Sequence, residues 1–183
     1  MRAVRRYYFP HSRPSSSAAG LVYNAVMSKK PTVVAVSGGF DPVHIGHLHL
    51  FRDAKALGDK LLVILNDDAW LRRKKGYVFM PQAERKELLE SIRWVDEVVV
   101  RTPRETYDIC HMLEKLDVQV FANGGDRKNE QDIPEAGVCK ERDIKMVFNV
   151  GDSGKPQSST WLVRELAKQI NNLDKLRETG KAI

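Results

Sequence analysis

The fold of this chain is decided by residues 37–47, which read Ser37-Gly38-Gly39-Phe40-Asp41-Pro42-Val43-His44-Ile45-Gly46-His47. An uncharged, mostly β-branched run at residues 32–36 precedes this stretch, and apolar residues at helical spacing occupy residues 45–57. The stretch is therefore a strand-to-helix turn. Two adjacent glycines let the backbone approach a ligand closely, and the helix presents free N–H groups at the same place. We expect an anion such as phosphate to bind there.

Two histidines of the turn are the candidate ligands of that anion. His47 shares a helical stripe with four apolar residues, so its ring faces the sheet, and His44 stands one turn earlier on the same side. The stripe comprises Leu50, Phe51, Ala54 and Leu57. Gly46 keeps a side chain out of the space between the rings, whereas His49 falls on the other face. The alternatives are a core role for His47 and a half-formed metal site made by the pair.

The string G-x-F-D-P-V-H-I-G-H resembles the motif of the cytidylyltransferase-like nucleotidyltransferases, whose H-x-G-H histidines contact the triphosphate of the nucleotide donor. The glycines, the Phe-Asp pair and both histidines occur in order at the strand-to-helix junction. The resemblance implies a catalytic role for His44 and His47. It implies nucleotide binding by the other motif residues, which are Gly38, Gly39, Phe40, Asp41 and Gly46.

Strands and helices alternate along the rest of the chain. The patterns predict strands at residues 60–66, 97–100, 118–122 and 145–150, and helices at 81–92, 108–116, 134–142 and 160–170. Strict alternation predicts a doubly wound, parallel, five-stranded sheet with helices on both faces, and the resemblance implies a Rossmann-like nucleotidyltransferase fold. Ligands of such sheets bind at the carboxyl ends of the strands.

Basic residues follow the second predicted strand in the run Arg72-Arg73-Lys74-Lys75-Gly76. By itself this run is typical of a solvated loop. Because members of the family place lysines in a flexible loop here, the resemblance implies a catalytic Lys74 and a nucleotide-binding Lys75. Arg85 matches the arginine of the family's Pro-x-x-x-Arg helix start and is a further nucleotide-binding candidate, with a surface ion pair as the alternative.

Two more strings follow later strands. Gly124, Gly125 and Asp126 resemble the G-G-D of heptose-phosphate adenylyltransferases, although a simple turn also favours these residues. Ser158-Ser159-Thr160 resembles the family's S-T-T string, whose hydroxyl and N–H groups bind phosphates; alternatively Ser159 is a helix N-cap. The residues before it are Asp152-Ser153-Gly154-Lys155, not the Arg-Thr pair of the glycerol-3-phosphate cytidylyltransferases.

Composition separates three regions. Residues 1–30 contain six of the 30 Lys and Arg residues and no acid, so the rest of the chain balances 24 basic against 24 acidic residues. We expect residues 1–30 to be a disordered extension, either a mitochondrial or plastid transit peptide or a mis-assigned start. Residues 31–170 form the nucleotidyltransferase domain, and residues 171–183 form a polar tail that frays. Otherwise we expect a cytoplasmic protein that binds neither nucleic acid nor membrane.

The resemblance implies transfer of a nucleotidyl group from CTP or ATP to a phosphorylated small molecule, with release of pyrophosphate. The superfamily favours CTP slightly, and Gly124-Gly125-Asp126 keeps ATP open. Mg²⁺ arrives with the triphosphate, no protein nucleophile is needed, and we expect a homodimer. The acceptor is a sugar, polyol or amino-alcohol phosphate. The rival function is a non-catalytic, nucleotide-binding regulatory protein with the same fold.

Overall fold

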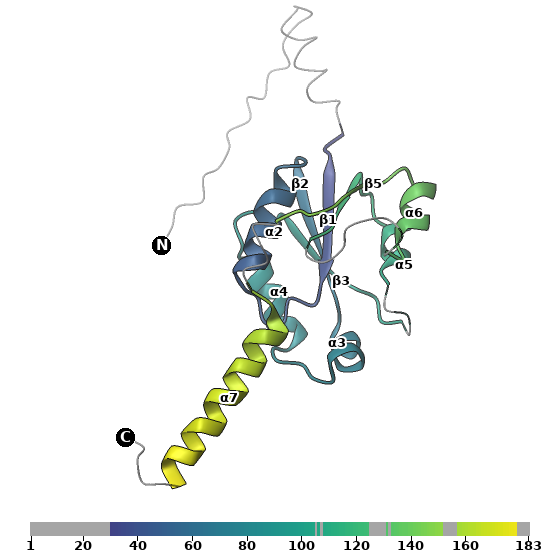
Figure 1. The fold of residues 1–183 in the computed structure, drawn as a ribbon. Coiled ribbons are helices and arrows are strands. Elements are labelled where there is room, and N and C mark those ends of the chain that lie inside the picture. Colours follow the sequence, from purple (N-terminus) through teal and green to yellow (C-terminus); the bar gives the residue numbers. More distant parts are fainter. Residues whose placement is uncertain are drawn as a thin grey trace, which may run out of the picture. The chain divides into compact units, whose positions relative to one another are not determined.

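A computed structural model describes residues 30–104, 106, 108–124, 131, 133–151 and 157–178, with side chains as far as Asn172. The chain divides into the units Met1–Pro31 and Thr32–Ile183, and the fold described here belongs to the second (Figure 1). The predicted disordered extension falls almost wholly on residues outside those described. In the described part of the chain, no helix has both the length and the apolar character needed to cross a membrane.

Five parallel strands form one sheet in the order β3-β2-β1-β4-β5. Their bounds are β1 (Val33–Gly38), β2 (Lys60–Leu65), β3 (Glu97–Val100), β4 (Val120–Ala122) and β5 (Lys145–Val147). The predicted doubly wound parallel sheet is therefore confirmed. From β1 the chain moves outward to β3 and then returns to the other side of β1. The topological switch point thus lies between β1 and β4, where open α/β sheets form their ligand crevice.

Helices cover both faces of the sheet (Figure 1). They are α2 (Ile45–Lys55), α3 (Asp68–Lys75), α4 (Gln82–Glu90), α5 (Cys110–Leu113), α6 (Ala136–Glu141) and α7 (Ser159–Glu178). One core cluster lies under α2 and α4 and contains Phe51 and Leu89, whereas a second lies under α5 and α6. Because strand side chains alternate, Val34 of β1 enters the first cluster and Ala35 enters the second.

The structure differs most from the sequence expectations in three helices, and β5 ends at Val147, before the predicted end at residue 150. The predicted flexible loop at residues 72–76 belongs to helix α3, which begins after the N-cap Asp67 and ends at Gly76 in the left-handed conformation, with φ of 81°. Both capping residues are favoured types at these positions. Helix α7 continues to Glu178, past the predicted end at residue 170, and α5 is shorter than predicted.

Candidate active site

The start of α2 fixes the tautomers of the two motif histidines. His44 is the N-cap residue, and its Nδ1 accepts a hydrogen bond from the Gly46 N–H at 3.1 Å. In return, Nδ1 of His47 accepts from the His44 N–H at 3.3 Å. Since both Nδ1 atoms act as acceptors, each neutral ring carries its proton on Nε2. The helix cap therefore leaves one Nε2–H donor on each ring for an external acceptor.

The same two rings are held close together and uncharged. The two imidazoles stack with centroids 3.7 Å apart, and the rings of Phe40 and His47 form a T-shaped pair with centroids 4.9 Å apart. Burial, the neighbouring His44 and the charge of Lys75 lower the pKa of His47 to about 3. Burial and Lys75 also lower the pKa of His44. At neutral pH both imidazoles are therefore hydrogen-bond donors without a positive charge.

The two lysines that end α3 take different positions. Lys75 is partly buried, and its Nζ donates to the Asp41 carbonyl oxygen at 3.3 Å. Burial lowers the pKa of Lys75, and its charge acts on both motif histidines. Lys74 is exposed and lies over the Trp70 ring, with Nζ 4.5 Å from the centroid. The cation beside the histidine pair is therefore Lys75.

Asp41 and Arg85 form a buried brace under the turn. Both side chains are fully buried. The Asp41 carboxylate accepts the N–H groups of Phe79 and Met80, each at 2.7 Å. The Arg85 guanidinium donates to three carbonyl oxygens, those of Gly39, Asn66 and Met80, and to the Asp68 carboxylate at 2.6 Å. The alternative of a surface ion pair at Arg85 is therefore wrong. Its predicted nucleotide contact stays a prediction, since four donor contacts already bind protein.

Two glycines of the motif are needed because aromatic or imidazole rings of the same turn lie against them, where a side chain would not fit. A Cβ atom on Gly38 would lie 2.8 Å from the Phe40 ring, and one on Gly46 would lie 3.1 Å from the His44 ring. Phe40 itself has a φ of 48°, in the left-handed region. These glycines therefore make room for the chain's own aromatic and imidazole rings. Gly39 makes similar room for Leu71 of α3.

The start of α7 lies beside the start of α2. Ser159 is buried, and its hydroxyl donates to the Pro42 carbonyl oxygen at 3.0 Å, across 117 residues of sequence. Ser158 caps the helix instead, because its Oγ accepts the Trp161 N–H at 3.1 Å. The alternative of Ser159 as N-cap is therefore wrong. Thr160 is exposed at the same helix start.

The fourth strand contributes less to the described site. Gly124 follows β4, and a Cβ atom there would lie 2.9 Å from the Val150 carbonyl oxygen. Gly125 and Asp126 fall outside the described residues. Their predicted nucleotide contacts, like the predicted phosphate contacts of the serine string, remain predictions.

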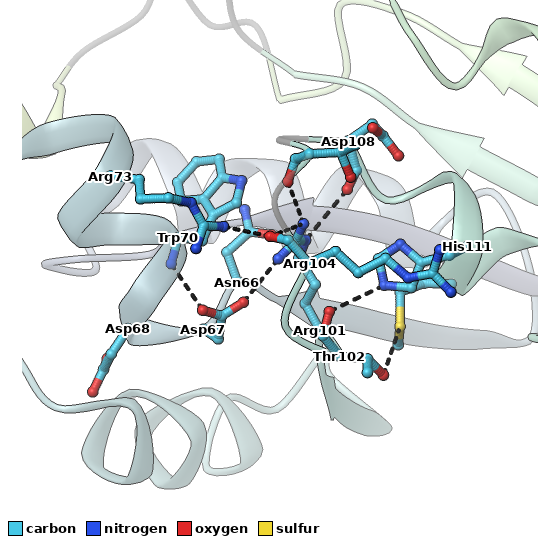
Figure 2. A network of polar contacts seen from close by, with 12 residues as sticks. Asn66, Asp67, Asp68, Trp70, Arg73, Arg101, Thr102, Arg104, Asp108 and His111 are labelled. Atoms are coloured by element: carbon cyan, nitrogen blue, oxygen red, sulfur yellow. Dashed lines mark hydrogen bonds and ion pairs between the residues drawn. The ribbon is translucent and has the colours of Figure 1, made fainter.

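Sequence reasoning missed a buried ion pair behind α3. Arg101 follows β3 directly, and its NH1 group bonds the Asp67 carboxylate at 2.9 Å, with both side chains buried (Figure 2). The other Asp67 oxygen accepts the Trp70 N–H at 2.8 Å as the α3 cap, while Arg101 also bonds carbonyl groups of residues 104, 106 and 108. The sequence offered one signal for this pair: an acidic residue and a basic residue follow two consecutive predicted strands, whose carboxyl ends lie at the same edge of the sheet. The pair ties the lysine-bearing helix to the sheet.

A metal role for the histidine pair finds no partner ligands among the residues that the structure describes. No group of three or more His, Cys, Asp or Glu side chains gathers in that part of the chain. In addition, both Nδ1 atoms already accept backbone N–H groups. The arrangement instead suits an anion with several acceptor oxygens.

Comparison with known sequences points in the same direction. The model of a family described as cytidylyltransferase-like matches residues 35–165. The chain is 41% identical over 100 residues to the FAD synthase of Thermococcus kodakarensis, covering 54% of this chain and 66% of that protein. It is 37% identical over 133 residues to the bifunctional protein HldE of Streptomyces coelicolor, covering 70% of this chain and 27% of that protein.

A further curated relative and a solved structure are also similar to this chain. The ethanolamine-phosphate cytidylyltransferase of Mus musculus is 31% identical over 134 residues, covering 69% of this chain and 32% of that protein. The chain thus covers less than two thirds of the length of these three curated relatives. A lipopolysaccharide core biosynthesis protein from Thermoplasma volcanium shares the fold, with a TM-score of 0.56, 22% identity, and coverage of 66% of this chain and 97% of that one.

Proposed function

Because the chain belongs to the cytidylyltransferase-like family, we propose that it is a nucleotidyltransferase that acts on CTP or ATP and a phosphorylated small molecule. The observation that carries the proposal is the pair of neutral imidazoles whose Nε2–H donors are fixed by the α2 cap. Such donors match phosphate oxygens, which accept hydrogen bonds and carry the negative charge.

The reaction requires a phosphate oxygen of the acceptor to attack the α-phosphorus in line, forming a P–O bond as the bond to pyrophosphate breaks. Phosphoryl-type transfer depends on positioning and charge stabilisation and needs no covalent protein intermediate. The Nε2–H groups of His44 and His47 hold phosphate oxygens, and Lys75 adds a positive charge beside them. The rings remain neutral, so they stabilise developing charge as donors and keep their protons.

Mg²⁺ is proposed to enter as the complex with the triphosphate. Magnesium prefers oxygen ligands, whereas the groups around the histidine pair are N–H donors and an ammonium. The carboxylate of the turn itself, Asp41, already accepts two backbone N–H groups. The described residues therefore do not fit a protein-held ion, and the protein's own task is to bind and orient the phosphates.

The test uses purified full-length protein, each of the four nucleoside triphosphates, and a panel of sugar, polyol and amino-alcohol phosphates. Pyrophosphate release that requires both a triphosphate and an acceptor supports the proposal. The matched control is His47→Asn, which should lose turnover while keeping its fold. Triphosphate binding without turnover, across the whole panel, would instead favour the regulatory function.

A further inference from the structure

Helix α3 is held at its start by two different arginines. The Asp68 carboxylate binds Arg85 of the brace at 2.6 Å, whereas the Asp67 carboxylate binds NH1 of Arg101 at 2.9 Å. Asp67 and Arg101 are both buried, and the other oxygen of Asp67 accepts the Trp70 N–H as the helix cap (Figure 2). Charge-assisted bonds of this kind are strong and directional. The position of the first turn of α3 therefore depends on Arg101 as well as on the brace.

Arg101 also orders the chain that follows β3. Its Nε and NH2 groups donate to three carbonyl oxygens between residues 104 and 108. One of them, the Arg104 carbonyl oxygen, also accepts NH2 of Arg73, in the second turn of α3, at 2.6 Å (Figure 2). The Arg101 guanidinium therefore ties α3 to the end of β3 at two points, directly at the cap and through this carbonyl group at the second turn.

The far end of α3 carries the cation of the histidine site. Lys75 is the last residue of the helix, and its Nζ donates to the Asp41 carbonyl oxygen at 3.3 Å. It lies eight residues beyond the Asp67 cap, which is about 12 Å along the helix axis. At that length, a tilt of about 10° at the cap moves Lys75 by about 2 Å. A displacement of this size is enough to break the bond to Asp41 and to move the charge away from the histidines.

We propose that Arg101 is a positioning residue for the transfer reaction: it fixes the tilt of α3 and so holds Lys75 beside the histidine pair before the triphosphate binds. The inference rests on the proposed nucleotidyltransferase function and assigns part of the triphosphate affinity to Arg101, which acts through Lys75. A cation that is already in place binds an anion more tightly, because less freedom is lost on binding. A displacement of about 1 Å caused by a distant change can lower a rate about 10²-fold.

The first experiment measures the Kd of CTP and of ATP by titration calorimetry, in a double-mutant cycle of Arg101→Met and Lys75→Met. Lys75→Met should raise the Kd of the more tightly bound triphosphate about tenfold, as for the loss of one charge-assisted hydrogen bond. Arg101→Met should raise it about 3- to 10-fold, because it displaces that same ammonium. The double variant should therefore stay near the value for Lys75→Met alone. Independent effects would multiply to about 30- to 100-fold and would overturn the inference.

A second variant covers the loss of the buried pair itself. Arg101→Met leaves the buried Asp67 carboxylate without its partner, which can unfold the chain. Arg101→Met combined with Asp67→Asn removes both charges and keeps an amide oxygen for the Trp70 N–H. This variant should fold and should raise the triphosphate Kd over the same range as Arg101→Met. A folded variant that binds the triphosphate with the wild-type Kd would show a purely structural ion pair and overturn the inference.

The matched control for lost stability is Ile144→Ala. Ile144 is buried under α5 and α6 and directly precedes β5, which lies at the opposite edge of the sheet from β3. The cavity should lower the melting temperature and leave the triphosphate Kd unchanged. A rise in Kd equal to that of Arg101→Met would assign the effect to general destabilisation and overturn the inference.

Failure of the proposed function has a different signature. Wild-type protein would then bind a triphosphate but release no pyrophosphate with any acceptor of the panel, while the Kd values of the cycle would still test the tie between Arg101 and Lys75. Wild-type protein that binds neither CTP nor ATP would overturn both the function and the inference.

Discussion

The histidine pair and Asp41 of the brace come from the same turn motif, but the pair and the brace use their polar atoms in opposite ways. Asp41 and Arg85 are fully buried, and their hydrogen bonds go to the protein's own backbone and to Asp68. His44 and His47 use one nitrogen each for the helix cap and retain the other as a donor. The motif therefore contains residues whose polar atoms bond only the protein itself and residues that retain a donor for an external acceptor, and only the hydrogen-bond partners distinguish the two.

The largest effect should come from breaking the brace. Arg85→Met removes a donor from each of three carbonyl oxygens and from the Asp68 carboxylate, and loss of one partner from a buried charged network costs about 3–5 kcal/mol. The free energy of unfolding, measured by urea denaturation, should fall by that amount. Lys86→Met, which removes an exposed pair with Glu90, should cost under about 0.5 kcal/mol. A loss below about 1 kcal/mol for Arg85→Met would contradict the structural role.

Changes in the histidine pair should lower turnover and leave stability almost unchanged, in contrast to changes in the brace. In His47→Asn the amide replaces the Nδ1 acceptor but does not reach the position of Nε2. Loss of a donor to developing charge typically costs about 2.7–4 kcal/mol, which is roughly 10²- to 10³-fold in kcat. Steady-state kinetics should show this fall with an almost unchanged melting temperature, and His44→Asn should behave alike. His49→Gln, on the other face of α2, is the control. Full activity in either motif variant would refute phosphate binding by that ring.

A smaller effect, on the KM of the triphosphate, should distinguish the two lysines of α3. Lys75→Met removes the cation beside the histidines, and a charge-assisted hydrogen bond contributes about 1.5 kcal/mol or more. The triphosphate KM should therefore rise roughly tenfold. Lys74→Met should change it little, because that ammonium lies over Trp70. The reverse result would support the catalytic role that the family resemblance implies for Lys74.

The pH dependence of stability should sharpen the comparison. The pKa of His47 falls to about 3 in the folded chain, against about 6.5 when unfolded, so the unfolded chain binds more protons between these values. Stability is therefore fully present above about pH 6.5 and is lost as pH falls, by up to about 1.4 kcal/mol per pH unit. Melting temperatures measured from pH 7 to 4.5 should fall less steeply in His47→Asn. Identical slopes would mean that His47 titrates normally.

The smallest effect is expected from deleting residues 1–26. They lack an apolar stripe at helical or strand spacing. The shortened protein should keep its melting temperature and turnover. Failure of the truncated chain to fold or to turn over substrate would show that the extension contributes to the domain.

Sequence patterns predicted the parallel five-stranded sheet and most helices, though not the order of the strands, because the period of the apolar residues reports the buried faces directly. They also brought His44 and His47 together on one side of α2. They could not identify the ion pair of Arg101 and Asp67, because a charged residue at the end of an apolar run is compatible with both a surface and a buried pair. Helix α3 was missed for a different reason. Its basic composition suggested a solvated loop, although the capping residues Asp67 and Gly76 were readable.

The hydrogen bond from Ser159 to Pro42 has a consequence for synthesis of the chain. A ribosome that has translated the first four strands has already made the histidines, yet the start of α7 that flanks them does not exist. A chain that stops before α7 therefore displays the histidine pair without this flanking helix start. If the pair binds phosphate as proposed, nucleotide affinity should arise only after the start of α7 has been translated, so shorter chains would not sequester triphosphates.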